Sequence, residues 1–462
     1  MDSVSFLALS LNHPIRKSFK RFPTTTEWAH FRKYARRMRD LRQWDTPDSP
    51  SKETFSAIQL CIANEPLLPN LKTLTLAGVR GWFVPFIPLF LSPKTTSVFL
   101  SFKSTLPEVI VASMTTTLPT LCPDLKKIAL YGLPKNSMIT TAVSGMLLVT
   151  NRNNLHGFRV DSPLTEEASE VLYELPELRS LEVVIERETR LPSASLPNLT
   201  ELVITCDNED GWPQLFHGAT LGKLEHVDFY LQSGQIGDFL GAFERAALSS
   251  SLQNTLSGLS IFTGRSWNPN YSSLLPFTQM VDLRVYFTCN DGCSSRVDDD
   301  IIINLSRAMP KLKSLGLGDA PCRQITTGVT TKGFLALAHH CPKLSTLCVH
   351  FQVASLGGSP GIPGMAPTAG PAGSWTDCAL TELDVGETPV PEGSAMTIAL
   401  TLIRIFPRLC FIECIDGGWE EVKNAINRSQ EIIDCSSKQR PFTTPRGTLN
   451  DHFTGVAFET SG

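Results

Sequence analysis

The chain has 462 residues, of which 42% are hydrophobic and 19% are charged, and its formal net charge is −4. This apolar content is enough for a continuous core and excludes a chain that is disordered throughout. The near-neutral charge argues against binding to bulk nucleic acid, because such binding needs a basic surface. The most apolar stretch, Gly81 to Leu91, is far shorter than the roughly 20 residues of a membrane span. We therefore expect neither a nucleic acid nor a membrane as partner.

A nine-residue phrase recurs along the chain. It reads LPNLKTLTL from Leu68, LPELRSLEV from Leu175, LPNLTELVI from Leu196, MPKLKSLGL from Met309 and CPKLSTLCV from Cys341. The shared core is L-x-x-L-x-L, which is typical of the strand segment of a leucine-rich repeat. The sequence therefore predicts an α/β leucine-rich-repeat solenoid, shaped like a horseshoe, with parallel strands on its inner face and helices on its outer face.

The first residue of each core marks where a strand is expected. Strong matches begin at Leu71, Leu125, Leu178, Leu199, Leu224, Leu312, Leu344 and Leu380, and weaker ones at Met38, Thr95, Leu155, Leu256, Met280 and Leu409. Neighbouring matches lie 21 to 36 residues apart, whereas regular repeats span about 20–29 residues. The longer steps should therefore contain full helices or loop insertions.

Segments between the cores have helical patterns with capping residues at their starts. Thr165 is expected to cap one helix, Asp298 or Asp299 the helix through IIINLSRAM, and Thr331 the helix KGFLALAHH. A further helix is expected from Ser394 to Phe406. Proline soon follows these helices, which ends them and directs the chain into the next extended segment.

The two ends are expected to cap the solenoid. Residues 1–37 are assigned to an N-terminal segment and cap helix, 38–420 to the solenoid with a flexible Gly/Pro-rich insertion at 356–373, 421–437 to a C-terminal cap helix, and 438–462 to a disordered tail. The N-terminal helix has an apolar face and a basic remainder. We interpret it as an amphipathic cap, and a basic binding face or a membrane-surface helix is the alternative.

Alternation along each strand turns the residues that flank the second core leucine toward the inner face. Large or charged residues at these positions, or just past the core, are the candidates for partner contact. They are Glu182, Glu201, His226, Asp228, Tyr230, Asp282, Arg284, Tyr286, His350, Glu382 and Asp384. Aromatic and arginine side chains are common hot spots of protein interfaces, so we expect a protein partner.

Signals of catalysis or metal binding are weak. Gly357 to Gly361 matches G-x-S-x-G, but Pro360 opposes the helix that a nucleophilic Ser359 would require. Twelve cysteines are scattered along the chain. The pairs four apart, at 289 and 293 and at 410 and 414, lack further zinc ligands nearby. We expect no enzyme activity, no metal and no other cofactor.

The cysteines also bear on location. So many unpaired thiols fit a reducing compartment. The start of the chain, MDSVSFLALSLNHP, has no basic n-region and only a short apolar run, unlike an export signal. We therefore expect an intracellular protein of the cytoplasm or the nucleus.

Three segments together resemble a known family. They are FPTTTEWAHFRKYARRMRDLRQW, VDDDIIINLSRAMPKLKSLGLG and TGVTTKGFLALAHHCPKLSTLCVHF. The set resembles the F-box/leucine-rich-repeat proteins that are expanded in mushroom-forming fungi, over about Phe22 to Glu420. The resemblance implies a substrate-recognition subunit of a Skp1–cullin–F-box ubiquitin ligase. In such proteins an F-box binds Skp1 and the repeats bind the protein to be ubiquitinated.

The chain departs from that family at its start. An F-box begins with a Leu-Pro and acidic phrase, and the residues before Phe22 carry none. We expect the F-box to be missing or reduced to a remnant within residues 1–37, and Skp1 to bind only if an F-box is restored. Two alternatives remain: a free-standing repeat scaffold or inhibitor, and a GTPase activator on the same arc. The activator would need an arginine or asparagine placed for phosphoryl chemistry, and no residue stands out for this role.

Overall fold

The computed structural model describes most of the expected solenoid. The residues it describes are 24–43, 51–62, 65–103, 106–185, 196–206, 212–216, 221–232, 238–264, 267, 269–287, 297–318, 328–357, 378–386, 388–414 and 418–436. The chain before residue 24, nearly all of the insertion expected at 356–373, the cysteines at 289 and 293, and the tail expected at 438–462 lie outside these residues.

Within the described residues, the strands form a single open sheet in sequence order, and every neighbouring pair is parallel. The fourteen strands are β1 (Asp40–Gln43), β2 (Thr73–Val79), β3 (Ser97–Phe102), β4 (Lys127–Tyr131), β5 (Gly157–Val160), β6 (Ser180–Ile185), β7 (Glu201–Cys206), β8 (His226–Leu231), β9 (Gly258–Thr263), β10 (Asp282–Phe287), β11 (Ser314–Leu317), β12 (Thr346–Val349), β13 (Glu382–Asp384) and β14 (Phe411–Glu413). Each begins two residues after one of the expected core positions, the weak ones included. The predicted fold class is confirmed.

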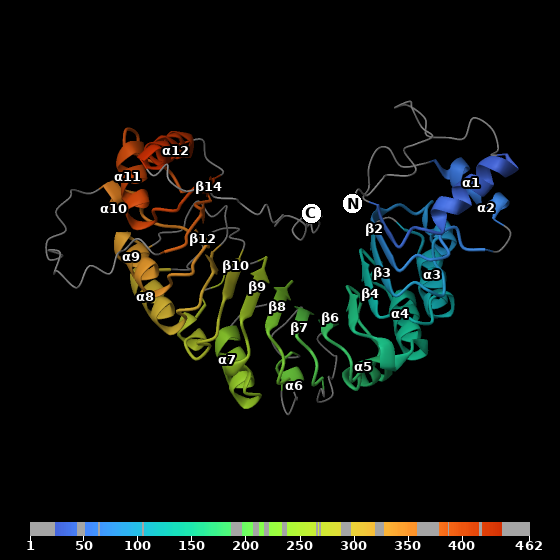
Figure 1. The fold of residues 1–462 in the computed structure, drawn as a ribbon. Coiled ribbons are helices and arrows are strands. Elements are labelled where there is room, and N and C mark those ends of the chain that lie inside the picture. Colours follow the sequence, from blue (N-terminus) through green and yellow to red (C-terminus); the bar gives the residue numbers. More distant parts are fainter. Residues whose placement is uncertain are drawn as a thin grey trace.

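Helices cover the outer side of the sheet (Figure 1). The α-helices are α1 (Thr25–Ala35), α2 (Lys52–Cys61), α3 (Glu108–Leu121), α4 (Ser137–Val149), α5 (Glu166–Tyr173), α6 (Pro213–Phe216), α7 (Phe239–Ser249), α8 (Asp299–Ala308), α9 (Thr331–His340), α10 (Val353–Gly357), α11 (Ala395–Ile405) and α12 (Trp419–Ser436). Short 3₁₀ helices are η2 (Val84–Leu89), η3 (Arg152–Asn154), η4 (Leu252–Asn254) and η5 (Tyr271–Leu274).

The arc curves toward its strands for a geometric reason. Neighbouring strands lie about 4.8 Å apart, whereas packed helices need about 8–10 Å between their axes. The helical layer is therefore the longer one, and the sheet lines the concave side (Figure 1). We call this concave side of the sheet the inner face.

Core positions hold the repeats together. The first core residue is completely buried in every repeat from Leu71 to Leu409, and that of the first repeat, Met38, is half-buried. Burying one leucine contributes about 1.5–3 kcal/mol, so the stacked cores stabilise each pair of neighbouring repeats. Thr95 occupies one such position, and its hydroxyl donates to the carbonyl of Leu71 at 3.2 Å, which satisfies its polar group inside the core.

The helix starts follow capping chemistry. Asp298 caps α8, since its Oδ1 accepts a hydrogen bond from the backbone of Ile301 at 2.9 Å, and Thr165 caps α5. The expectation for α9 was wrong by one residue. Thr330 is the capping residue, and Thr331 is the first residue of the helix.

Candidate partner-binding surface

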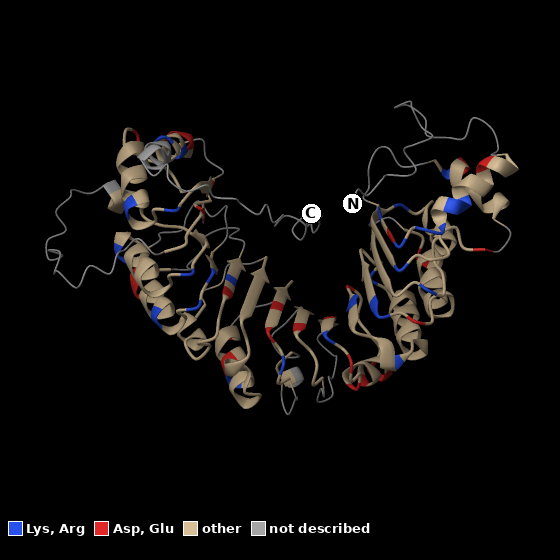
Figure 2. Ribbon diagram, viewed as in Figure 1, with Lys and Arg blue, Asp and Glu red and all other residues tan. Residues whose placement is uncertain are grey.

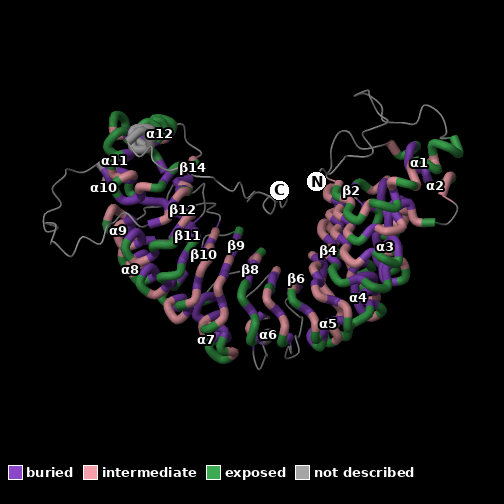
Figure 3. The backbone as a smooth tube through the Cα atoms, in the orientation of Figure 1, coloured by how far each residue is buried: buried purple, intermediate pink, exposed green. Residues whose placement is uncertain are grey.

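Strand register aligns the inner-face side chains into rows that cross the sheet. Three of these rows run across β6 to β10. The first contains Ser180, Glu201, His226, Gly258 and Asp282; the second contains Glu182, Val203, Asp228, Ser260 and Arg284; the third contains Val184, Thr205, Tyr230, Phe262 and Tyr286. Buried and more accessible positions alternate along β8 and β10 (Figure 3), whereas Glu182 on β6 and Val203 on β7 are buried as well. The repeats thus present one continuous array of side chains on adjacent strands.

A hydrogen-bonded cluster occupies the start of this array. The hydroxyl of Tyr131 on β4 donates to Glu182 Oε2 on β6 at 2.7 Å. Arg159 on β5 donates to Ser180 Oγ at 2.8 Å and to Glu201 Oε2 at 2.5 Å. Both Tyr131 and Arg159 reach past the adjacent strand. These contacts fix the side chains in place, so the surface is ordered before any partner arrives.

Charge on the inner face is mixed, with carboxylates grouped on β6 to β8 (Figure 2). Burial raises the pKa of Glu182, although the Tyr131 hydroxyl and the charge of Arg159 lower it. Burial also raises the pKa of Asp228, although a hydrogen bond from Ser260 lowers it. Both carboxylates are therefore less stable in their ionised form than in water, and a cation placed beside them would stabilise that form.

Three aromatic rings lie side by side in the third row. The ring centroids of Tyr230 and Phe262 are 4.8 Å apart with planes 8° from parallel, and those of Phe262 and Tyr286 are 5.4 Å apart at 30°. All three side chains are half-buried. On the neighbouring strand β11, Gly316 pairs with Arg284 of the second row, and a Cβ there would lie 2.7 Å from the Tyr286 hydroxyl. Glycine leaves the space that this ring occupies.

Eight of the eleven residues expected from the sequence come together on β6 to β10. They are Glu182, Glu201, His226, Asp228, Tyr230, Asp282, Arg284 and Tyr286. Glu382 and Asp384 lie apart on β13, with β11 and β12 between. His350 was expected to be a contact residue, but only 9% of it is exposed, and its Nδ1 lies 3.3 Å from Thr388 Oγ1. Glu182 is also 9% exposed.

Three large side chains that make the contacts described above were not among those expected: Tyr131, Arg159 and Phe262. Phe262 follows the last core position of its repeat, as Tyr230 and Tyr286 do in the repeats on either side. Aligning the three repeats would have found it. Tyr131 and Arg159 join the surface through contacts two strands away, which no single repeat encodes.

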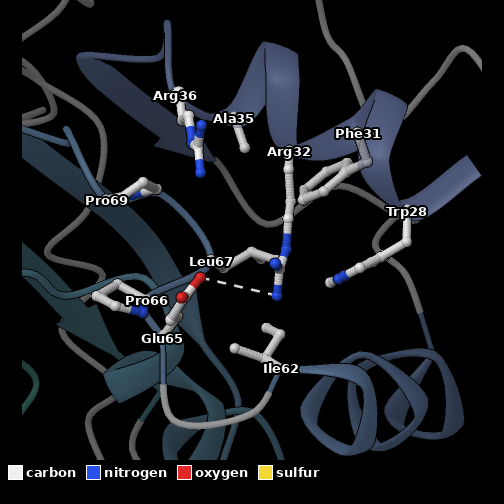
Figure 4. Close-up of a pocket in the computed structure, with 10 residues that line it drawn as sticks. All are labelled: Trp28, Phe31, Arg32, Ala35, Arg36, Ile62, Glu65, Pro66, Leu67 and Pro69. Carbon is white, nitrogen blue, oxygen red and sulfur yellow. Dashed lines mark ion pairs between the residues drawn. The ribbon is translucent and has the colours of Figure 1, made fainter. Parts of the chain in front are cut away.

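A separate small pocket lies at the N-terminal end, between the α1 region on one side and Ile62 with residues 65–69 on the other (Figure 4). Arg32 and Glu65 form an ion pair across it, with 3.7 Å between Nη2 and Oε2. The Nε1 of Trp28 is buried there without a hydrogen-bond partner among the described residues. The remaining lining is mostly apolar, as expected where a cap helix packs on the first repeats.

Among the described residues, no group of three or more His, Cys, Asp or Glu side chains could hold a metal ion. Among the same residues, no helix combines the length and the apolar character needed to cross a bilayer.

Comparison with known proteins gives likenesses in structure alone. No family model matches the chain, and no curated protein matches it. Among solved structures, an internalin from Listeria monocytogenes is 11% identical with a TM-score of 0.33, over 85% of this chain and 87% of the internalin. A leucine-rich-repeat protein from Leptospira interrogans is 12% identical with a TM-score of 0.36, over 91% of this chain and 98% of that protein. Neither likeness bears on what this chain binds.

Proposed function

We propose that this protein is a non-enzymatic recognition module that binds a protein partner on the inner face of β6 to β10. The observation that carries the proposal is the half-exposed stack of Tyr230, Phe262 and Tyr286 beside a charged, hydrogen-bonded cluster. Aromatic anchors surrounded by polar groups are the common composition of interface hot spots. A stable interface covers about 800 Å² on each partner, and several adjacent strands are needed to supply it.

Within this role, the adaptor of a ubiquitin ligase is our first candidate. The support is the resemblance of three segments of the chain to F-box/leucine-rich-repeat proteins of fungi. In that case the inner face would bind the protein to be ubiquitinated, Skp1 would bind only with an F-box restored, and the protein would be intracellular. A free-standing repeat scaffold or inhibitor is the alternative, and it uses the same inner face.

Site-specific photo-cross-linking tests the recognition role. A benzoylphenylalanine replaces Phe262 on the inner face, and in a matched protein it replaces Glu167, which is exposed on the outer helix α5. We expect a defined protein to be cross-linked from position 262 and not from position 167. That protein, once purified, should bind the unmodified chain. Equal cross-linking from both positions, or none from position 262, would contradict the proposal.

A binding assay with purified Skp1 separates the two candidates. The chain is tested as it stands and with an F-box joined to its N-terminus, and a partner identified by cross-linking is added to both. An adaptor should hold Skp1 and the partner at the same time in the F-box form. If the F-box form binds Skp1 but then excludes the partner, the free-standing scaffold is the better description.

A further inference from the structure

The residues that directly precede successive strands form a column along one edge of the sheet. The carbonyl of Arg39 accepts hydrogen bonds from the backbone N–H groups of Lys72 and Thr73, at 2.6 and 3.0 Å. The same two-donor pattern joins each column residue to the next repeat, as far as β14. The column therefore has a fixed backbone and a spacing of about 4.8 Å. In the first six repeats it contains Arg39, Lys72, Thr96, Lys126, His156 and Arg179.

This part of the column is basic, although the chain as a whole has a net charge of −4. We compared the four positions from the residue before each core to its third residue. There the first six repeats hold seven Lys or Arg and three Asp or Glu, whereas the other eight repeats hold five and four. The excess of positive charge thus belongs to the first six repeats. Its exposed members, which we call the basic edge, are Arg39, Lys72, Lys94, Lys126, Lys127 and Arg179.

The cations of the basic edge lack counter-ions in the described part of the chain, where no ion pair involves any of the six. Two of them share a neutral partner. Arg39 Nη1 donates to the carbonyl of Asn70 at 3.3 Å, and Lys94 Nζ donates to Asn70 Oδ1 at 2.7 Å. Asn70 therefore places two like charges beside one uncharged residue, an arrangement that an added carboxylate would stabilise.

The basic edge suits a single extended acidic chain. Exposed charges act over about 8 Å at physiological salt, and neighbouring column positions are closer than this, so their attraction for an anion adds. Asp40, Asp124 and Glu177 lie beside the column and would repel a broader anion. Single-stranded nucleic acids rely on aromatic rings that stack on their bases. The four compared positions contain no Phe, Tyr or Trp in the first six repeats.

We propose that the basic edge binds an extended acidic segment of a protein partner, which crosses the starts of β1 to β6. Carboxylates of the segment pair with Lys72 and Lys126, and one of them bridges Arg39 and Lys94 beside Asn70. Charge-assisted hydrogen bonds of this kind are stronger than neutral ones. The inference goes beyond the recognition role proposed above and does not rest on the aromatic rings of β8 to β10.

The first test measures the affinity of fluorescein-labelled octaglutamate, octalysine and octauridylate by anisotropy. Octaglutamate should bind most tightly. Lys72→Glu with Lys126→Glu should weaken it about tenfold or more, because two attractions become repulsions. Lys313→Glu with Lys343→Glu makes the same change of charge at exposed positions of later repeats and should have little effect. Circular dichroism and thermal unfolding show whether each variant is folded.

The second test locates the bound peptide without changing any charge. Thr96 and Ser345 are both half-buried column residues. Their hydroxyls make matching hydrogen bonds, from Thr96 to the carbonyl of Lys72 at 3.3 Å and from Ser345 to that of Lys313 at 3.0 Å. Benzoylphenylalanine in place of Thr96 should cross-link octaglutamate, whereas benzoylphenylalanine in place of Ser345 should not.

Three results would overturn the acidic-segment site. Equal losses of affinity in the two charge-reversed variants would show general charge attraction. Tighter binding of octauridylate than of octaglutamate would indicate a nucleic-acid site, and equal cross-linking from positions 96 and 345 would remove the assigned location. The recognition role fails by a different result, since it depends on cross-linking of a partner from position 262.

Discussion

The rings of Tyr230 and Phe262 are stacked 4.8 Å apart on neighbouring strands. Their side chains are 32 residues apart in the chain and meet because each occupies the same place in its repeat. Repetition in a solenoid thus produces a continuous strip of side chains, here the rings of Tyr230, Phe262 and Tyr286. Conversely, a change at one position of the strip alters the surface without disturbing the cores of distant repeats.

Replacing the middle ring of the strip should separate binding from folding. Phe262→Ala removes a half-buried side chain and two ring contacts, each pair worth about 0.5–1.5 kcal/mol. We expect partner affinity to fall about tenfold or more, with a modest loss of stability in urea. Phe411→Ala is the control, because Phe411 is also aromatic and is 55% exposed on the distant strand β14. Equal loss of binding in both variants would contradict the assignment of the surface.

Gly316 on β11 offers a second test, because it borders the ring of Tyr286. A Cβ at this position would lie 2.7 Å from the Tyr286 hydroxyl and 3.0 Å from the carbon that bears it. Gly316→Ala should therefore displace the tyrosine ring and lower partner affinity, as seen in binding assays and in the ring resonances of Tyr286. Gly145→Ala is the control, since nothing lies within 4 Å of its added Cβ. In the interior of α4 it should stabilise the protein by about 0.5–1 kcal/mol.

The positions of the repeats could be predicted from the sequence, because the cores depend on the local spacing of leucines. Even the weak core at Thr95 produced a strand, since its hydroxyl is satisfied within the core. Exposure was harder to predict. His350 and Tyr230 both follow a core, but His350 packs against Thr388 from another repeat while Tyr230 stays accessible. Such differences depend on side chains that lie tens of residues apart.

The cap of α9 is a test of local structure. Thr330 Oγ1 accepts from the backbone of Lys332 at 3.2 Å and donates to Asp299 Oδ2 at 2.7 Å. Thr330→Ala should therefore cost about 1–2 kcal/mol of unfolding free energy. Thr331→Ala should cost less, because that hydroxyl donates to the Ser355 carbonyl, at 3.2 Å, which lies outside the cap. Urea denaturation of both variants measures the difference, and a larger loss for Thr331→Ala would argue for the cap expected from the sequence.

The burial of Glu182 should make stability depend on pH. Burial raises the folded-state pKa of Glu182 above its ordinary value of 4.5, so the folded state binds the proton more tightly than the unfolded state does. Stability from this group is therefore present at low pH and is lost as pH rises above about 4.5 through the folded pKa. The Tyr131 hydroxyl opposes this loss, because it lowers the pKa of Glu182.

Tyr131→Phe should therefore raise that pKa further and steepen the loss. We expect the variant to be less stable than the unaltered protein by about 1.5–3 kcal/mol at pH 7, and by less near pH 4. Glu182→Gln keeps an acceptor for the tyrosine but removes the titration, so it should gain stability relative to the unaltered protein as pH rises from 4 to 7. Urea denaturation across this range measures both trends. If the stability difference between Glu182→Gln and the unaltered protein stayed constant with pH, burial would not govern the ionisation of this carboxylate.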